Sequence, residues 1–179
     1  MQVVLFPLEV LHITQGMDND FSHGGSYAID FKGTTARAQL YAPCDMELVA
    51  RSWFWVAYTS IAPVRFANGS SGYFTVWVIH DDDQYYIPRT VLQGQPFAKT
   101  GTAGYATGDH VHIETKVGIW EGQIQNSEGV WMMKNSAPPT EFFVINDTTI
   151  IEDKGYPWGT FSGGYPFRPY GEGLPIWML

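Results

Sequence analysis

The sequence is poor in several residues and patterns that build common kinds of site. It has one cysteine, Cys44, among 179 residues, which excludes an intrachain disulfide and a thiolate metal cluster within this chain. We interpret Cys44 as a small buried side chain and not as a nucleophile. No apolar run reaches membrane-spanning length, so we expect no membrane insertion. No segment resembles the elbow that presents a nucleophilic serine, which disfavours a serine or cysteine hydrolase.

Basic residues are scarce as well. The chain has 10 Lys and Arg against 18 Asp and Glu, for a formal net charge of -8. An acidic chain gains nothing from a polyphosphate partner, so we expect no nucleic-acid binding. The first ten residues are apolar but contain no Lys or Arg, and Pro7 and Glu9 interrupt them. They predict a first strand and not a signal peptide.

The apolar residues that are present favour an all-β fold. Hydrophobic residues make up 45% of the chain and aromatic residues 16%, enough to bury a core. Short runs of β-branched and aromatic residues alternate with Gly, Pro, Asn and Asp, and no long stretch has the helical period. The strands that this pattern predicts are residues 3–6, 27–31, 46–50, 53–58, 73–79 and 111–116. Residues 68–72, Asn-Gly-Ser-Ser-Gly, predict a turn between two strands.

The composition changes near Val117. Residues 118–179 contain Trp120, Trp131, Trp158 and Trp177, together with six prolines. Residues 141–151 predict one or two strands, and the rest predicts loops. This extension either packs on the preceding domain or forms an aromatic binding surface, and we favour packing.

Two histidines stand side by side in His110-Val111-His112. Residues i and i+2 of a strand point to the same face, so the triplet offers two imidazoles together while Val111 faces apolar packing. Glu114 continues that face and is suited to orient an imidazole. The glycine-rich segment 101–108 precedes the strand and places its start at the edge of a cleft. Without further features, two surface histidines would be the preferred interpretation of the pattern.

A carboxylate inside an apolar strand is the second feature. Asp30 lies between Ile29 and Phe31, where a charge is costly unless it is paired or bound to a metal. A buried aspartate that accepts backbone hydrogen bonds is the alternative. His23 precedes two glycines and can reach the same point. Two imidazoles and one carboxylate form the usual ligand set of a catalytic zinc, with the fourth position left for water.

With these residues in place, the sequence resembles the M23 metallopeptidases, the lysostaphin-type or LytM-type endopeptidases. That family has a His–Asp element followed much later by His-x-His. Residues 41–45 (YAPCD), 94–104 (GQPFAKTGTAG) and 107–114 (TGDHVHIE) are similar to three further family motifs. The resemblance covers roughly residues 10–117 and implies a compact antiparallel β-sheet peptidase core with a groove.

The chain departs from the most familiar family members at three places. Six residues separate His23 from Asp30, a spacing similar to the longer variant of bacteriophage-encoded members. Asp109 stands where the family usually has proline, and Cys44 stands where it has a small residue. None of these changes removes a ligand.

The resemblance implies that one Zn²⁺ is held by His23, Asp30 and His112. It makes His80 and His110 catalytic imidazoles for proton transfer, although a strand-end histidine would otherwise be the simplest interpretation of His80. His12 has no role in the family, and we expect it to be structural. The residues expected to support the ligands or to line the substrate groove are Glu114, Thr107, Tyr27, Tyr73 and Tyr105.

The expected organisation is a zinc endopeptidase domain at 1–117 and an aromatic- and Pro/Gly-rich extension at 118–179. The expected activity is hydrolysis of peptide bonds in peptidoglycan cross-links or stems. As a bacteriophage endolysin the protein would leave the host cytoplasm through a holin, and as a virion-associated lysin it would arrive from outside. We expect a monomer unless it is part of a virion. The alternative is a catalytically weak wall-binding or tail-tip structural module of the same fold.

Overall fold

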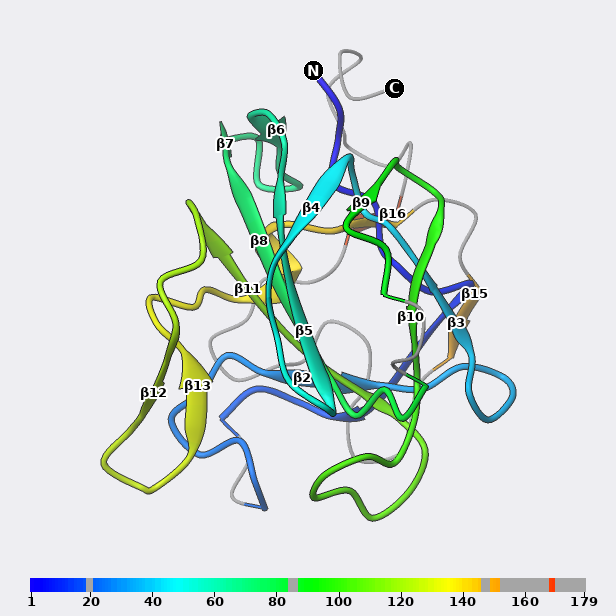
Figure 1. Ribbon diagram of the computed structural model, residues 1–179, viewed down its shortest axis with the longest axis vertical. Helices are drawn as coiled ribbons and strands as arrows, with labels where there is room; N and C mark the ends of the chain where they lie inside the picture. Colours follow the sequence, from blue (N-terminus) through cyan, green and yellow to red (C-terminus); the bar gives the residue numbers. More distant parts are fainter. Residues whose placement is uncertain (19–20, 84–86, 146–148, 152–167, 170–179) are drawn as a thin grey trace.

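The computed structural model describes residues 1–18, 21–83, 87–145, 149–151 and 168–169, and for the last two ranges the backbone alone. Strands dominate the described residues, and a 3-10 helix, η1 (Pro139–Glu141), interrupts them (Figure 1). The expected all-β fold is confirmed. In the parts of the chain that are described, no helix has the length and apolar composition needed to cross a membrane.

An eight-stranded sheet forms the centre of the molecule. Neighbouring strands are antiparallel, except that β1 and the edge strand β15 run parallel. In spatial order the strands are β15 (Thr149–Ile151), β1 (Val10–Gln15), β2 (Ile29–Phe31), β11 (Val111–Val117), β8 (Phe74–Ile79), β5 (Trp55–Ser60), β4 (Met46–Arg51) and β9 (Thr90–Val91).

Four two-stranded pairs surround this sheet. They are β10 (Pro96–Lys99) with β3 (Gln39–Tyr41), β12 (Gln123–Gln125) with β13 (Trp131–Met133), β14 (Val144–Ile145) with β16 (Arg168–Pro169), and β6 (Val64–Arg65) with β7 (Ser71–Gly72). Figure 1 shows the β10–β3 pair on one side of the long strands and the β12–β13 hairpin on the other.

One face of the sheet buries the main core. Val111 and Ile113 of β11 point into it, with side chains from β10 and β3 opposite. Phe142 and Phe143, which follow η1, pack in the same core. Cys44 is also buried there, and burial raises its pKa to about 12, which fits the expected packing role. Each fully buried Val, Ile or Phe side chain of this core contributes about 1.5–3 kcal/mol to the stability of the fold.

The other face carries the polar residues of β11. His112 and Glu114 alternate with the core residues, as the two-residue period of a strand requires. Trp77, Ile79 and Met133 form a smaller apolar cluster on that side. The β12–β13 hairpin packs there through Met133. The same alternation therefore separates the core from the site.

Most of the expected strands are present with shifted ends. Residues 27–31, 46–50, 53–58, 73–79 and 111–116 contain or overlap β2, β4, β5, β8 and β11, and the expected turn joins β6 to β7.

The prediction of a strand at residues 3–6 was wrong. Val3 and Leu5 make single bridges to Arg65 and Val144, because this segment passes between two different partners and no one strand pairs along it. Residues 141–151 supply β14 and β15, as expected. Trp158 and Trp177 lie outside the described residues.

Candidate metal centre

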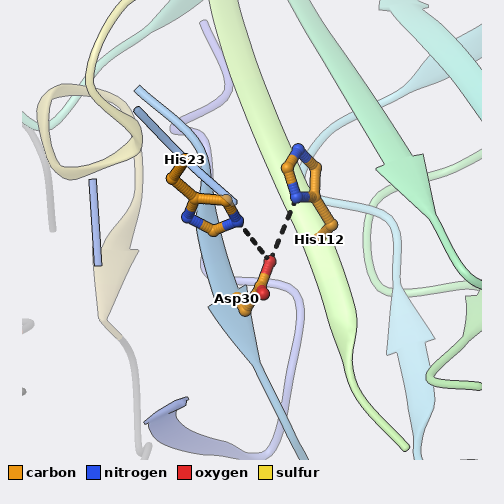
Figure 2. Close-up of side chains that lie close together, drawn as sticks. All are labelled: His23, Asp30 and His112. Atoms are coloured by element: carbon orange, nitrogen blue, oxygen red, sulfur yellow. Dashed lines mark ion pairs between the residues drawn. The ribbon is translucent and has the colours of Figure 1, made fainter. Parts of the chain in front are cut away.

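Asp30 and His112 form a directly opposed pair on neighbouring strands. The register of β2 and β11 aligns the two residues, and both side chains leave the sheet on the face opposite the core. His112 Nδ1 lies 3.1 Å from Asp30 Oδ1 (Figure 2). Asp30 is 5% exposed and His112 9%, so neither group is solvated well. The sheet itself therefore places two of the three expected ligands.

His23 reaches the same carboxylate from the loop before β2. Its Nε2 lies 3.1 Å from Asp30 Oδ1, the atom that also faces His112 (Figure 2). The loop is closed on itself, since Ser26 N donates to His23 O and Gly25 N donates to Asp18 Oδ1. Gly25 has φ +69°, which glycine adopts at low cost. The longer spacing between His23 and Asp30 thus forms a compact loop that brings the imidazole back.

Hydrogen bonds fix which ring nitrogens carry lone pairs. His23 Nδ1 lies 2.9 Å from Gly16 O, and a carbonyl can only accept, so Nδ1 carries the hydrogen and Nε2 the lone pair. His112 Nε2 lies 3.3 Å from Glu114 Oε1, which in the same way leaves Nδ1 to face Asp30. This is the orientation that partners of metal-bound imidazoles impose.

The donor set fits a zinc ion. One ligand atom from each of His23, Asp30 and His112 lies within 4.8 Å of the others. His23 Nε2 and Asp30 Oδ1 are buried and have no hydrogen-bond partner among the described residues. Two electron-rich atoms 3.1 Å apart with no hydrogen between them repel each other, and a cation removes that cost. Two imidazoles and a carboxylate suit Zn²⁺ with an open fourth position.

Glu114 anchors His112 from behind. It is fully buried, with Oε1 toward His112 and Oε2 accepting a 2.8 Å hydrogen bond from Met133 N. Both carboxylate oxygens are therefore engaged.

His110 and His80 lie beside the three ligands. His110 Nε2 is 3.4 Å from Asp30 Oδ2, and the ring centroids of His110 and His80 are 4.4 Å apart. Nδ1 of His80 donates to Ala103 O at 2.7 Å, and Nδ1 of His110 donates to Gly108 O at 2.8 Å. All four histidines of the expected site are thus brought together.

The backbone of His80 is strained in order to place its ring. Its φ is +84°, which is uncommon for a residue with a side chain. His80 N donates to Phe54 O, and His80 O accepts from Ala103 N. A Cβ on Gly101 would overlap His80 O, so glycine is required there. Strain of this kind costs about 1–3 kcal/mol and persists where the surrounding structure enforces it.

The pKa values reflect this crowding. Burial acts to raise the pKa of Asp30, but its interactions with the His112 and His23 imidazoles hold it far below its ordinary value. Burial lowers the pKa of His80 to about 4, aided by His110 and His112. Burial would lower the pKa of His112, but Asp30 and Glu114 outweigh it and raise the value to about 9 in the metal-free chain. Asp30 is therefore ionised and His80 neutral at neutral pH.

A cavity of about 630 Å³ opens over the centre. Six aromatic side chains besides the histidines contribute to its walls, and its ionisable lining residues are Asp30, the four histidines and Tyr105. The residues that line it besides the four histidines and Asp30 are Gln15, Phe21, Ser22, Ser52, Phe54, Trp55, Trp77, Ile79, Tyr105, Ala106, Thr107, Gln123, Val130 and Trp131.

The remaining predicted residues divide into two groups. Tyr105 and Thr107 line the cavity, whereas Tyr27 and Tyr73 do not. Tyr73 precedes β8 and His80 follows it, so the two lie at opposite ends of a strand of about 20 Å. Tyr27 is 46% exposed outside the cavity. His12 lies in β1, which pairs with β15, and does not line the cavity either.

Sequence reasoning missed Gln15, Trp77 and Trp131 in the wall. Trp77 pairs with Glu114 in the register, so alternation along β8 could have indicated its face. Gln15 faces the site after an irregularity in the pairing of β1 and β2. Trp131 comes from the β12–β13 hairpin, which local patterning does not connect to the site.

No family model matches the chain. It is 31% identical over 164 residues to Morphogenesis protein 1 of Bacillus phage B103, a match that covers 89% of this chain. The chain spans 45% of the length of that relative.

Similar solved structures include a zinc-containing peptidase from Vibrio cholerae (20% identity, 65% of this chain and 37% of that one, TM-score 0.49). A second is the catalytic domain of lysostaphin from Staphylococcus simulans (17% identity, 72% of this chain and 85% of that one, TM-score 0.42). A third is the M23 metalloprotease pseudoalterin, from the deep sea (14% identity, 77% of this chain and 73% of that one, TM-score 0.43). The chain resembles the M23 peptidases. The short distances among His23, Asp30 and His112 support the ligand set without reference to these similar proteins.

Proposed function

We propose that this protein is a zinc-dependent endopeptidase that hydrolyses peptide bonds in bacterial cell-wall peptidoglycan. The observation that carries the proposal is the convergence of His23 Nε2, Asp30 Oδ1 and His112 Nδ1 on one point beneath an open cavity. The motif resemblance to M23 peptidases supports the same conclusion. Zinc, when bound, supplies Lewis acidity toward a peptide carbonyl and an attacking water.

The chain's own residues supply the proton chemistry. His80 is neutral at pH 7, and its Nδ1 hydrogen is committed to Ala103 O, which leaves the Nε2 lone pair to accept a proton. His110 stands beside it, and a proton on its Nε2, the ring nitrogen that Gly108 O does not engage, would let it hydrogen-bond negative charge that develops on the carbonyl oxygen. His80 takes the part of a general base, because no His-Glu-x-x-His element occurs in the sequence.

The cavity favours a short peptide with small, uncharged side chains. Its aromatic walls, with Trp55, Trp77 and Trp131, offer apolar contact and stacking, and few charged groups to pair with an ionic substrate. Peptide cross-links or stems of peptidoglycan fit this description. The strongly acidic chain also argues against nucleic acid as the substrate.

The name of the phage relative, Morphogenesis protein 1, supports a virion-associated lysin more than an endolysin released through a holin. In that role the chain acts at the wall from outside the cell. A catalytically weak tail-tip or wall-binding module of the same fold is the alternative, and it would keep the fold without peptide hydrolysis.

One experiment tests the proposal. The purified chain is stripped of metal, reloaded with zinc and incubated with purified walls from several bacteria, and released fragments are identified by mass spectrometry. We expect new peptide termini with the zinc-loaded chain, none with the metal-free chain, and recovery on adding zinc back. Binding to walls without new termini would support the structural module instead.

A further inference from the structure

We propose that the β12–β13 hairpin is a positioning element of the metal centre, which holds His23 through Asn126 and His112 through Glu114. This inference rests on the proposed zinc site. The hairpin runs from Gln123 to Met133 and lies outside the sheet that carries Asp30 and His112. In Figure 1 it lies to the left of β11 and beside the blue segment that leads into β2.

Asn126 makes the first connection. Its Nδ2 donates a 2.8 Å hydrogen bond to Gly24 O, the carbonyl next to His23. The Asn126 amide cannot rotate freely, because Oδ1 accepts from both Glu128 N and Val130 N at 3.0 Å. The backbone of Asn126 is paired with Val130 and Gly129 as well. A rigid turn thus presents one donor to the loop that carries the ligand.

The loop leaves room for this approach. A Cβ on Gly25 would lie 2.9 Å from Asn126 Nδ2, and one on Gly24 would overlap the Glu128 carboxylate. The two glycines after His23 therefore let the hairpin tip lie against the loop. On its inner side, His23 is held by Gly16 O. The ligand loop is fixed from both sides.

Met133 makes the second connection at the other end of the hairpin. Its N–H donates to Glu114 Oε2, while Glu114 Oε1 faces His112 Nε2. Met133 is fully buried, which keeps this end of the hairpin in place. One short hairpin thus contacts the supports of both imidazole ligands.

Two substitutions separate a positioning role from general stability. Asn126→Asp keeps the oxygen that the turn needs but replaces the donor that faces Gly24 O by a second acceptor. Asn68→Ala is the control, because Asn68 caps the β6–β7 turn in the same way, through Ser70 N, and lies outside the cavity lining. Outer partners of metal ligands typically contribute 10–100-fold to affinity, and we expect a loss of about tenfold for Asn126→Asp.

The measurements are the zinc dissociation constant, by competition with a chromophoric chelator, and the absorption spectrum of the cobalt-substituted protein. We expect Asn126→Asp to weaken zinc binding and alter the cobalt spectrum, with metal-free melting close to that of Asn68→Ala. An unchanged dissociation constant and spectrum would overturn the inference alone. A wild-type chain that binds no zinc would overturn the proposed function and this inference with it.

A second measurement needs no variant, and decides the matter if Asn126→Asp does not fold. Binding linkage is reciprocal, so a hairpin that supports zinc binding is itself stabilised by zinc. We expect amide hydrogen exchange at Asn126, Val130 and Met133 to slow when zinc is added, while the Val64–Gly72 hairpin exchanges as before. Equal exchange in the metal-free and zinc-loaded chains would contradict the proposal.

Discussion

Asp30 and His112 face each other across antiparallel strands, with His112 Nδ1 3.1 Å from Asp30 Oδ1. Because both lie in the interior of an eight-stranded sheet, their separation is set by the spacing of β2 and β11 and not by flexible loops. His23 alone among the three proposed ligands comes from a loop.

The ligand assignment predicts which substitutions remove zinc. We expect His112→Ala and Asp30→Asn to lower zinc affinity by more than about 100-fold, beyond the usual effect of outer partners. His12→Ala is the control, since His12 does not line the cavity. Bound zinc is measured by elemental analysis after dialysis. Stoichiometric zinc in His112→Ala would refute the assignment.

Zinc binding should release a proton near neutral pH. The pKa of His112 is about 9 in the metal-free chain, so its imidazole is protonated at pH 7 and must lose that proton to bind a metal through Nδ1. We expect the apparent zinc affinity to increase with pH up to about 9 and to fall steeply toward pH 5. Calorimetric titration in buffers with different ionisation enthalpies measures the proton. An affinity independent of pH over this range would rule out histidine ligands.

The stability of the metal-free chain should decrease with rising pH in the alkaline range, whereas its zinc affinity increases. Since the folded-state pKa of His112 lies above the ordinary 6.5, its charged form stabilises the fold below about pH 6.5, and that contribution is lost as pH rises through 9. The pKa of Asp30 is lowered, so its contribution is lost in acid instead. We expect the metal-free chain to lose a few kcal/mol between about pH 6.5 and 10. Urea unfolding with a chelator present, compared with the zinc-loaded chain, tests this.

Removing the proton-transfer groups should separate catalysis from metal binding. His80→Ala and His110→Ala are each expected to lower kcat by about 10²–10⁴-fold, the usual range for general acid–base groups, with zinc still bound. Their rings contact the centre, but the three proposed ligands do not depend on them. Tyr73→Phe, outside the cavity, is the control. Turnover of a wall-derived peptide near the wild-type rate in both variants would exclude the proposed roles.

Two glycines of the loop before β11 should respond differently to alanine. Gly101→Ala places a methyl group against His80 O and near Asp82 N, both backbone atoms that cannot move cheaply. We expect a loss of about 1–3 kcal/mol together with reduced kcat, because His80 is displaced. Nothing lies within 4 Å of a Cβ on Gly108, and Gly108→Ala should be close to neutral. Thermal melts and initial rates compare the two, and equal behaviour would contradict the account of His80.

The sequence predicted the polar face of β11 well, because alternation along a strand is a local property. His110, His112 and Glu114 needed no knowledge of their neighbours, and Asp30 was conspicuous as a charge in an apolar strand. The pairing of Asp30 with His112 was not accessible, since it depends on the order of β2 and β11 in the sheet. The left-handed backbone of His80 likewise depends on Phe54 and Ala103.

The β12–β13 hairpin could not be predicted for a different reason. Gln123, Ile124 and Gln125 are all exposed and show no alternation of buried and exposed positions. The hairpin is specified by its turn and by contacts distant in the sequence, such as Asn126 with Gly24. Local propensity carries little information about such a segment.

The hydrogen bond from Asn126 to Gly24 joins positions 102 apart in the chain. During synthesis, a nascent chain that has exposed every ligand still lacks the hairpin that supports two of them. On the proposed role of the hairpin, the zinc affinity of the finished protein is therefore reached only after the chain has been made through Met133.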